Sequence, residues 1–182
     1  MGHATGHSPV LLFMAAFSRH QTALDWALAR AETSWGPLAL TSERFHFDQT
    51  DYYEATMGTG LQKCLCTVSG LIDPARLPEI KLQTNAWEAE YAAEHHHTEV
   101  RPLNLDPGYL TLAKLVLATT KDRDHRIYVG RGIYAEGTLY YRSGGWQRRQ
   151  WTYPDYNTPG YHAFLEQCRN YLRQALKSAN AP

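Results

Sequence analysis

The amino-acid sequence predicts an α+β fold in a single domain. A continuous apolar run at Val10–Phe17 predicts a strand that is buried on both faces, and apolar residues at helical spacing follow it. Strand-like and helix-like segments then alternate along the 182 residues, a length typical of one domain. With 43% hydrophobic and 20% charged residues, the composition excludes a disordered chain. We expect residues 1–8 to form a flexible tail and residues 9–178 to form the domain.

Between residues 9 and 106 the elements are expected in the order strand, helix, strand, strand, helix, strand. Alanines and leucines from Ala23 to Ala31 predict the first helix, and Asp73-Pro74 predicts the start of the second. The strands after the first are predicted at Leu38–Phe47, Leu61–Val68 and Glu99–Leu105. The last of them leads into Asp106-Pro107-Gly108, a typical turn sequence. This βαββαβ order is typical of a ferredoxin-like sheet.

Residues 107–178 are expected to add a helix, a β-hairpin and a second helix to that unit. Leu112, Leu115, Val116 and Thr119 favour a helix over Tyr109–Thr120. Arg126–Val129 and Ile133–Tyr141 predict a hairpin around Gly130-Arg131-Gly132, and a short third strand follows it. An amphipathic helix is predicted from Tyr161 to Ala175.

Charge and cysteine content limit the possible functions. The net charge is zero, which excludes a generally basic nucleic-acid-binding protein. Residues 1–99 nevertheless hold six Lys and Arg against twelve Asp and Glu, and residues 100–182 hold the reverse, so a local basic surface for an anionic ligand stays possible. An odd set of three cysteines forms no disulfide framework, and we expect a cytoplasmic protein. The apolar run is far shorter than the roughly 20 residues of a membrane span, so no membrane contact is expected.

The strongest candidate region lies between Asp106 and Glu136. Asp106 is expected to precede a helix whose free N–H groups would face a ligand, with Lys114 and Lys121 on one helical face. Lys121, His125 and Arg126 then crowd together and could clamp a phosphate or carboxylate. The alternative is that Asp106 caps the helix and that the basic side chains only form a solvated surface.

Glu136 is the second candidate for proton transfer. Glu136 shares one face of the predicted hairpin with Tyr134 and Tyr140, so it lies between aromatic rings. Partial burial there would raise its pKa toward that of a general acid or base. The alternative is that Glu136 only forms a salt bridge with Arg126.

Other candidate ligand-binding residues come from separate segments. The acidic and aromatic loop after the second strand contributes Asp51 and Tyr52, and carboxylates there could hold Mg²⁺ unless they merely form turns. No metal-binding residue is assigned, because the consecutive histidines at 95–97 point in different directions on a helix and Cys64-x-Cys66 lacks a second pair. The remaining candidates are Lys81 and Asn85 on the second helix (otherwise a solvated helix surface), Asn104, and Tyr153 and Asp155 in a Tyr-Pro-Asp-Tyr loop.

Two strings resemble a prokaryotic family known as domain of unknown function 4416. They are Asn104–Thr111 (NLDPGYLT) and Trp151–Tyr156 (WTYPDY), and weaker matches extend over about residues 9 to 177. Because no activity is established for that family, the resemblance implies kinship and a shared fold but no function.

These observations favour a site for an anionic small molecule where residues 48–53, 104–109, 121–126 and 151–156 meet. If the protein is an enzyme, phosphate or nucleotide chemistry is expected, with Asp106, Glu136 and His125 as the catalytic residues. The sequence lacks the phosphate-binding, dinucleotide-binding, serine-hydrolase and zinc-protease motifs. The alternative is a non-catalytic interaction or RNA-binding module, although a strand covered on both faces disfavours an open RNA-binding sheet.

Overall fold

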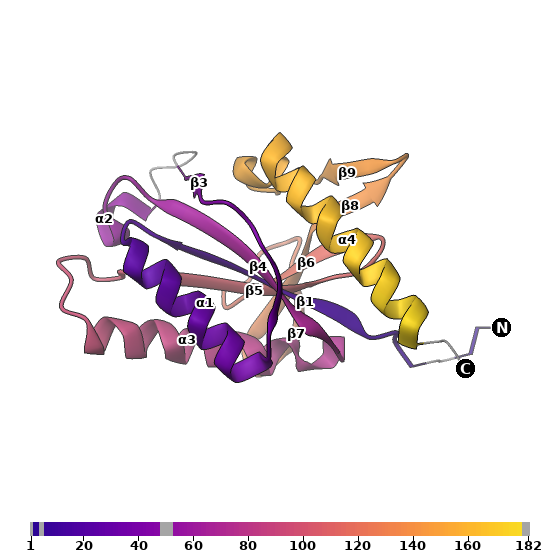
Figure 1. The fold of residues 1–182 in the computed structure, drawn as a ribbon, viewed down its shortest axis with the longest axis horizontal. Coiled ribbons are helices and arrows are strands. Elements are labelled where there is room, and N and C mark those ends of the chain that lie inside the picture. Colours follow the sequence, from indigo (N-terminus) through magenta and orange to yellow (C-terminus); the bar gives the residue numbers. More distant parts are fainter. Residues whose placement is uncertain (1, 4–5, 48–52, 180–182) are drawn as a thin grey trace.

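Strand β1 (Val10–Ser18) lies in the middle of the structure, and all nine of its residues are buried. It pairs antiparallel with β4 (Gln62–Ile72) on one side and with β5 (Asn104–Leu110) on the other. The expectation of a central strand covered on both faces is therefore confirmed. The computed structural model describes residues 2–3, 6–47 and 53–179 (Figure 1).

The described strands form one antiparallel sheet in the order β2-β4-β1-β5-β6-β8-β7, with β3 beside β4 and β9 beside β8. The predicted α+β class is confirmed, but the sheet has nine strands, because β6 to β9 continue it beyond β5. The bounds of the strands not yet named are β2 Leu38–Thr41, β3 Phe45–His46, β6 Lys114–Thr119, β7 Ile127–Gly130, β8 Ile133–Arg142 and β9 Gly145–Arg148.

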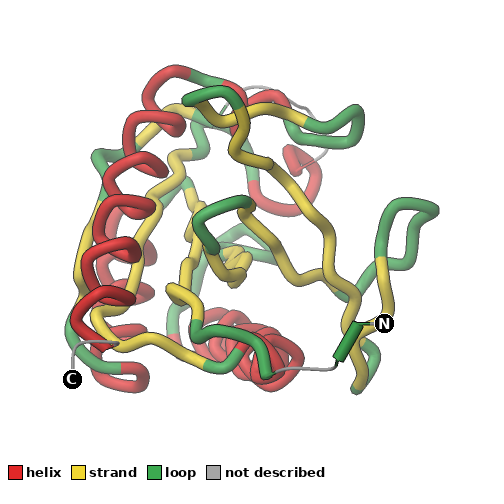
Figure 2. Tube along the Cα trace, turned by 90° about the vertical axis from the view of Figure 1, so that its right-hand side faces the viewer, coloured by secondary structure: helices red, strands yellow, loops and turns green. Residues whose placement is uncertain are grey.

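Helices cover both faces of this sheet (Figures 1 and 2). Helices α1 (Gln21–Trp35) and α3 (Leu77–Glu94) pack on one face, where Met14 and Ala16 of β1 join their apolar side chains. Helix α4 (Pro159–Ala179) packs on the other face against Phe13 and Ala15. This alternation along β1 is the two-residue period of a strand, and it places one apolar core on each side of the sheet. The fourth helix, α2 (Glu54–Met57), is a single turn.

The prediction of a helix at Tyr109–Thr120 is wrong. Its first residues end β5, and residues 114–119 form β6, which returns antiparallel to β5. Thr111 makes the turn, because its Oγ1 accepts hydrogen bonds from the N–H groups of Ala113 and Lys114, both at 3.1 Å. The apolar spacing that suggested a helix also suits β6, in which four consecutive residues are buried.

Two other boundaries differ from the prediction. The strand expected at Leu38–Phe47 is two short strands, β2 and β3, and the last strand of the βαββαβ unit begins at Asn104 rather than at Glu99. The helices α1, α3 and α4 and the β7–β8 hairpin are present as expected. Asp73 accepts a hydrogen bond from Ala75 N–H before Pro74–Arg76 leads into α3, which confirms the predicted cap. Within the described residues, no helix is long and apolar enough to cross a membrane.

Candidate functional site

A pocket forms where β5 and β6 separate. The two strands pair at only three positions, from Gly108 to Leu110 on β5, although β5 begins at Asn104. Pro107 comes just before the first of these positions and has no N–H to donate to a neighbouring strand. Gly108 brings the backbones close, since a Cβ atom there would lie 2.1 Å from the carbonyl oxygen of Val116. Beyond this point the strands diverge and leave a cavity of about 130 Å³.

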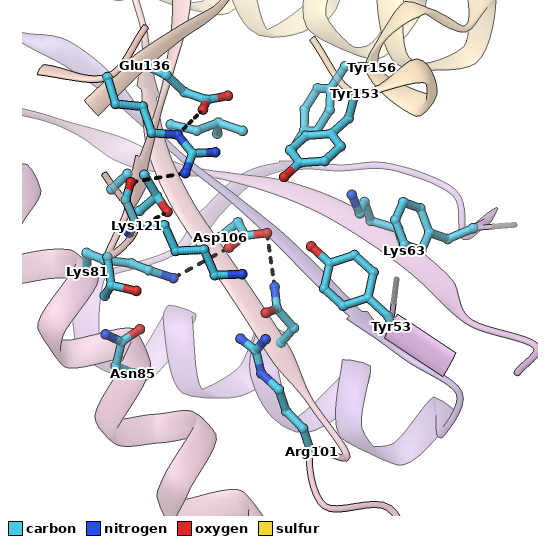
Figure 3. A pocket seen from close by; sticks show the side chains of 17 residues that line it. Tyr53, Lys63, Lys81, Asn85, Arg101, Asp106, Lys121, Glu136, Tyr153 and Tyr156 are labelled. Atoms are coloured by element: carbon cyan, nitrogen blue, oxygen red, sulfur yellow. Dashed lines mark hydrogen bonds and ion pairs between the residues drawn. The ribbon is translucent and has the colours of Figure 1, made fainter. Parts of the chain in front are cut away.

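Segments that are distant in the sequence line this pocket (Figure 3). At roughly 30 Å³ per water, the cavity has room for about four waters or for part of a small metabolite. Among the described lining residues, five side chains are cationic and two are carboxylates. The lining residues are Phe47, Tyr53, Lys63, Lys81, Asn85, Arg101, Asn104, Asp106, residues 117–121, Arg126, Glu136, Tyr153 and Tyr156.

Asp106 lies centrally among the labelled side chains of Figure 3. One carboxylate oxygen accepts a hydrogen bond from Asn104 Nδ2 at 3.0 Å, because residues two apart share a face of β5. The other lies 3.4 Å from Nζ of Lys81, which reaches across from α3 and also donates to the Leu105 carbonyl at 2.7 Å. Lys81 is buried, whereas the Asp106 side chain is 31% exposed. The expectation that Asp106 precedes a helix is wrong, so its orientation comes from these two donors.

Arg126 and Glu136 form a buried ion pair in the pocket wall. Nε of Arg126 donates to a Glu136 carboxylate oxygen at 2.8 Å, and Nη1 donates to the carbonyl of Lys121 at 3.0 Å. His125 lies behind this pair, with Nε2 3.4 Å from Glu136 and its ring stacked on Trp151. Glu136 therefore forms the salt bridge that the sequence offered as the alternative to a proton-transfer role.

Lys63 is a pocket residue that sequence reasoning missed. It extends from β4, is buried, and forms an ion pair with Asp155 at 2.7 Å. Its ammonium also lies 4.2 Å from the ring centre of Phe47 and 5.0 Å from that of Tyr156. The sequence does contain an indication of this role, because Lys63 is the single charged residue in the apolar strand at 61–68. An isolated charge in a buried strand needs a partner.

Arg101 is a second pocket residue that was not predicted from the sequence. Its guanidinium donates to a carboxylate oxygen of Glu88 on α3 at 2.8 Å, and the other oxygen of Glu88 accepts the Leu105 N–H at 2.7 Å. Burial raises the pKa of Glu88, although the positive charges of Lys81 and Arg101 oppose that shift. Glu88 thus fixes both the arginine and the start of β5 at the pocket.

Buried hydroxyl groups lie beside the ion pair of Lys63 and Asp155. Among the described residues, the hydroxyl of Tyr156 has no hydrogen-bond partner, whereas the hydroxyl of Tyr161 lies within hydrogen-bonding reach of the Asp155 carboxylate. Burial raises the pKa of both tyrosines, and the negative charge of Asp155 adds to the shift. Tyr156 lines the pocket, but its hydroxyl is itself buried and does not open onto the cavity.

The structure brings together many of the predicted site residues but not all of them. In the pocket wall lie Lys81, Asn85, Asn104, Asp106, Lys121, Arg126, Glu136 and Tyr153, with Asp155 directly behind it. His125 contacts Glu136 without lining the pocket, Tyr134 packs edge-on against Tyr128 of the β7–β8 hairpin, and Lys114 is exposed at the far end of β6. Asp51 and Tyr52 lie outside the described residues.

Comparison with known proteins identifies the family but no function. The chain matches no curated protein, and it matches no solved structure. Residues 8–171 match the family model described as Domain of unknown function (DUF4416). That match covers most of the chain, including every residue of the pocket wall described above. The protein is therefore a member of the DUF4416 family.

Proposed function

We propose that this protein is a cytoplasmic protein that binds a small anionic molecule, carrying a phosphate or a carboxylate group, in the pocket between β5 and β6. The observation that carries the proposal is the meeting of five cationic side chains, among the described residues, around one cavity. Three free cysteines support the compartment, because a reducing environment keeps thiols unpaired.

The arrangement of the charges supports an anionic ligand. The carboxylates near the pocket hold the cations in place: Asp155 holds Lys63, Glu88 holds Arg101 and Glu136 holds Arg126. Arg126 uses two of its five N–H donors in the bonds described above, so others remain for a ligand oxygen. Preorganised donors of this kind bind phosphate or carboxylate without first having to be ordered.

A catalytic role, as a further part of the proposal, would belong to Asp106. It is the more exposed of the two lining carboxylates, and its two donors hold it in one orientation. Asp106 would therefore accept or donate the proton in a phosphate-group reaction, and Arg126 would bind the charged group. Glu136 and His125 would position Arg126. We do not include Mg²⁺, since both oxygens of Asp106 already have cationic or N–H neighbours.

A ligand screen with two matched lysine variants tests the proposal. Inorganic phosphate, nucleotides and small carboxylates are added in turn, and the midpoint of thermal unfolding is measured. A ligand at 100 times its Kd should stabilise by about 2.7 kcal/mol, or about 5–11 °C for a domain of this size. Lys121→Met should weaken the best ligand about 10- to 100-fold, whereas Lys114→Met, an equally exposed lysine outside the pocket, should not.

If no anion stabilises the protein, or if both lysine variants lose affinity equally, the pocket is not the site. Salt-dependent binding of an RNA oligonucleotide that Lys121→Met leaves unchanged would instead support the RNA-binding alternative.

For the fold, we propose that residues 9–106 form a ferredoxin-like unit within the larger sheet. The order β2-β4-β1-β5, with α1 and α3 on one face, supports this description. The strands β6 to β9 then extend that unit, and the pocket lies at the junction between the two parts.

A further inference from the structure

We infer that His20, His97 and Glu99 form a binding site for a divalent transition metal of the zinc class. One ligand atom from each of the three side chains lies within 4.8 Å of the other two. His20 immediately precedes α1, whereas His97 and Glu99 lie on the connection between α3 and β5. The inference does not depend on the function proposed for the pocket, because none of these three side chains lines it.

The contacts within the cluster show that its side chains already face one another. Nε2 of His20 lies 2.9 Å from Oε2 of Glu99, and the rings of His20 and His97 lie with their centres 4.0 Å apart and their planes tilted by 31°. In a tetrahedral zinc site with bonds of about 2.0–2.2 Å, ligand atoms lie about 3.3–3.6 Å apart. Closing the cluster around a metal therefore needs the ligand atoms to approach by about 1 Å and the imidazole rings to rotate until one nitrogen of each points at the metal.

The backbone on both sides of the cluster is anchored. Oγ of Ser18 accepts the His20 N–H at 2.9 Å and donates to the Pro102 carbonyl at 2.5 Å, which ties the start of α1 to the α3–β5 connection. The ring of His97 lies 3.2 Å from the hydroxyl of Tyr91, a buried residue of α3. These hydrogen bonds anchor the backbone of His20 and the ring of His97 next to the cluster.

The types of donor atom select the class of metal. Two imidazole nitrogens and one carboxylate oxygen suit zinc and its neighbours, whereas Mg²⁺ and Ca²⁺ prefer oxygen ligands alone. Three protein ligands leave at least one position for water. Arg19 donates to Oε1 of Glu99 at 2.9 Å, so it can orient the carboxylate while Oε2 faces the metal.

The histidine run at 95–97 contributes only one ligand. His95 ends α3, and its ring lies 3.2 Å from the Tyr91 carbonyl. His96 is exposed, and all three histidines follow α3 instead of lying on a helix as the sequence had suggested. A local sequence pattern does not contain this cluster, because the partner of His97 is a histidine 77 positions earlier.

Metal titration of the full chain tests the site. The protein is produced without a polyhistidine tag, treated with a chelator and titrated with Zn²⁺ against a coloured indicator. We expect one zinc per chain in the wild type and at least an approximately 100-fold weaker affinity in His97→Ala and Glu99→Gln. Co²⁺ should give visible absorption bands that both variants lose. His96→Ala is the matched control, because it removes an exposed histidine of the same run.

Each outcome decides the question. Circular dichroism is used to check that each variant is folded. If His97→Ala does not fold, Glu99→Gln still tests the site, because it keeps the size of the side chain. Retained binding in either folded variant, equal loss in His96→Ala, or no zinc binding by the wild type would overturn the inference. Equal affinity for Mg²⁺ and Zn²⁺ would also contradict it, since imidazole ligands discriminate between the two ions.

Discussion

Breaking the buried pair of Lys63 and Asp155 should destabilise the protein strongly. Both side chains are less than 5% exposed, and the distance between Nζ and the carboxylate oxygen is 2.7 Å. Lys63→Met keeps the length of the side chain but leaves the Asp155 carboxylate buried without its cation. Removing one partner of a buried pair costs about 3–5 kcal/mol. The cation–π contacts with Phe47 and Tyr156 are lost as well, so we expect the upper part of this range.

Chemical unfolding followed by tryptophan fluorescence measures this cost. The chain has 182 residues, and 3–5 kcal/mol corresponds to about 6–20 °C in the thermal midpoint for a protein of this size. Asp155→Asn should lower the free energy of unfolding by a similar amount. The double variant should lose clearly less than the sum of the two single variants, because it has no buried charge without a partner. Lys114→Met, on the exposed end of β6, is the control and should stay within about 0.5 kcal/mol. A cost below about 1 kcal/mol for Lys63→Met, or additive effects, would refute the reasoning.

Two further predictions concern the packing of the sheet. Gly108→Ala places a Cβ atom 2.1 Å from the Val116 carbonyl oxygen, so it should lower the free energy of unfolding in urea by about 1–3 kcal/mol or more. Gly137→Ala is the control and should cost little, because there is open space around Gly137. Equal effects of the two substitutions would contradict the account of the strand junction. The buried thiols of the folded protein should not react with a thiol reagent at about pH 8. Burial raises the pKa of Cys168 to about 12, whereas an exposed thiol has a pKa of 9.0. The free energy of unfolding should therefore fall as the pH rises above 9.0, because the thiol then ionises in the unfolded chain but not in the folded protein. Rapid labelling of the folded protein would show that burial does not protect the thiols, which are Cys64, Cys66 and Cys168.

Much of the fold could be predicted because local patterns and tertiary packing agree. The apolar run of β1, the Asp73 cap and the amphipathic face of α4 each fit only one kind of element. Residues 109–120 differ, because their apolar spacing fits a helix and a doubly buried strand equally well. What decides between them is pairing with strands that are distant in the sequence, and a local pattern does not contain that information.

The site was predictable in part for a related reason. Charged or polar residues in distinctive strings, such as Asp106 and Arg126, could be recognised without knowing the topology. Lys63 and Arg101 could not, because each is a single charge whose partner lies elsewhere in the chain: Asp155 for the first and Glu88 for the second. Their place in the pocket depends on the order of the strands, which a local pattern does not determine.

The same two residues explain both the error in the fold and the position of the pocket. Pro107-Gly108 reads as a turn in the sequence, yet in the structure it lies inside β5. There Pro107 offers no N–H to β6, and Gly108 lets the strands touch before they diverge. The divergence exposes Asp106 on one side and residues 117–121 on the other, and it lets Lys81 reach the gap from α3. A substitution that restored regular pairing between β5 and β6 would therefore close the cavity, so this irregular strand junction is needed for the site and is not a defect of the sheet.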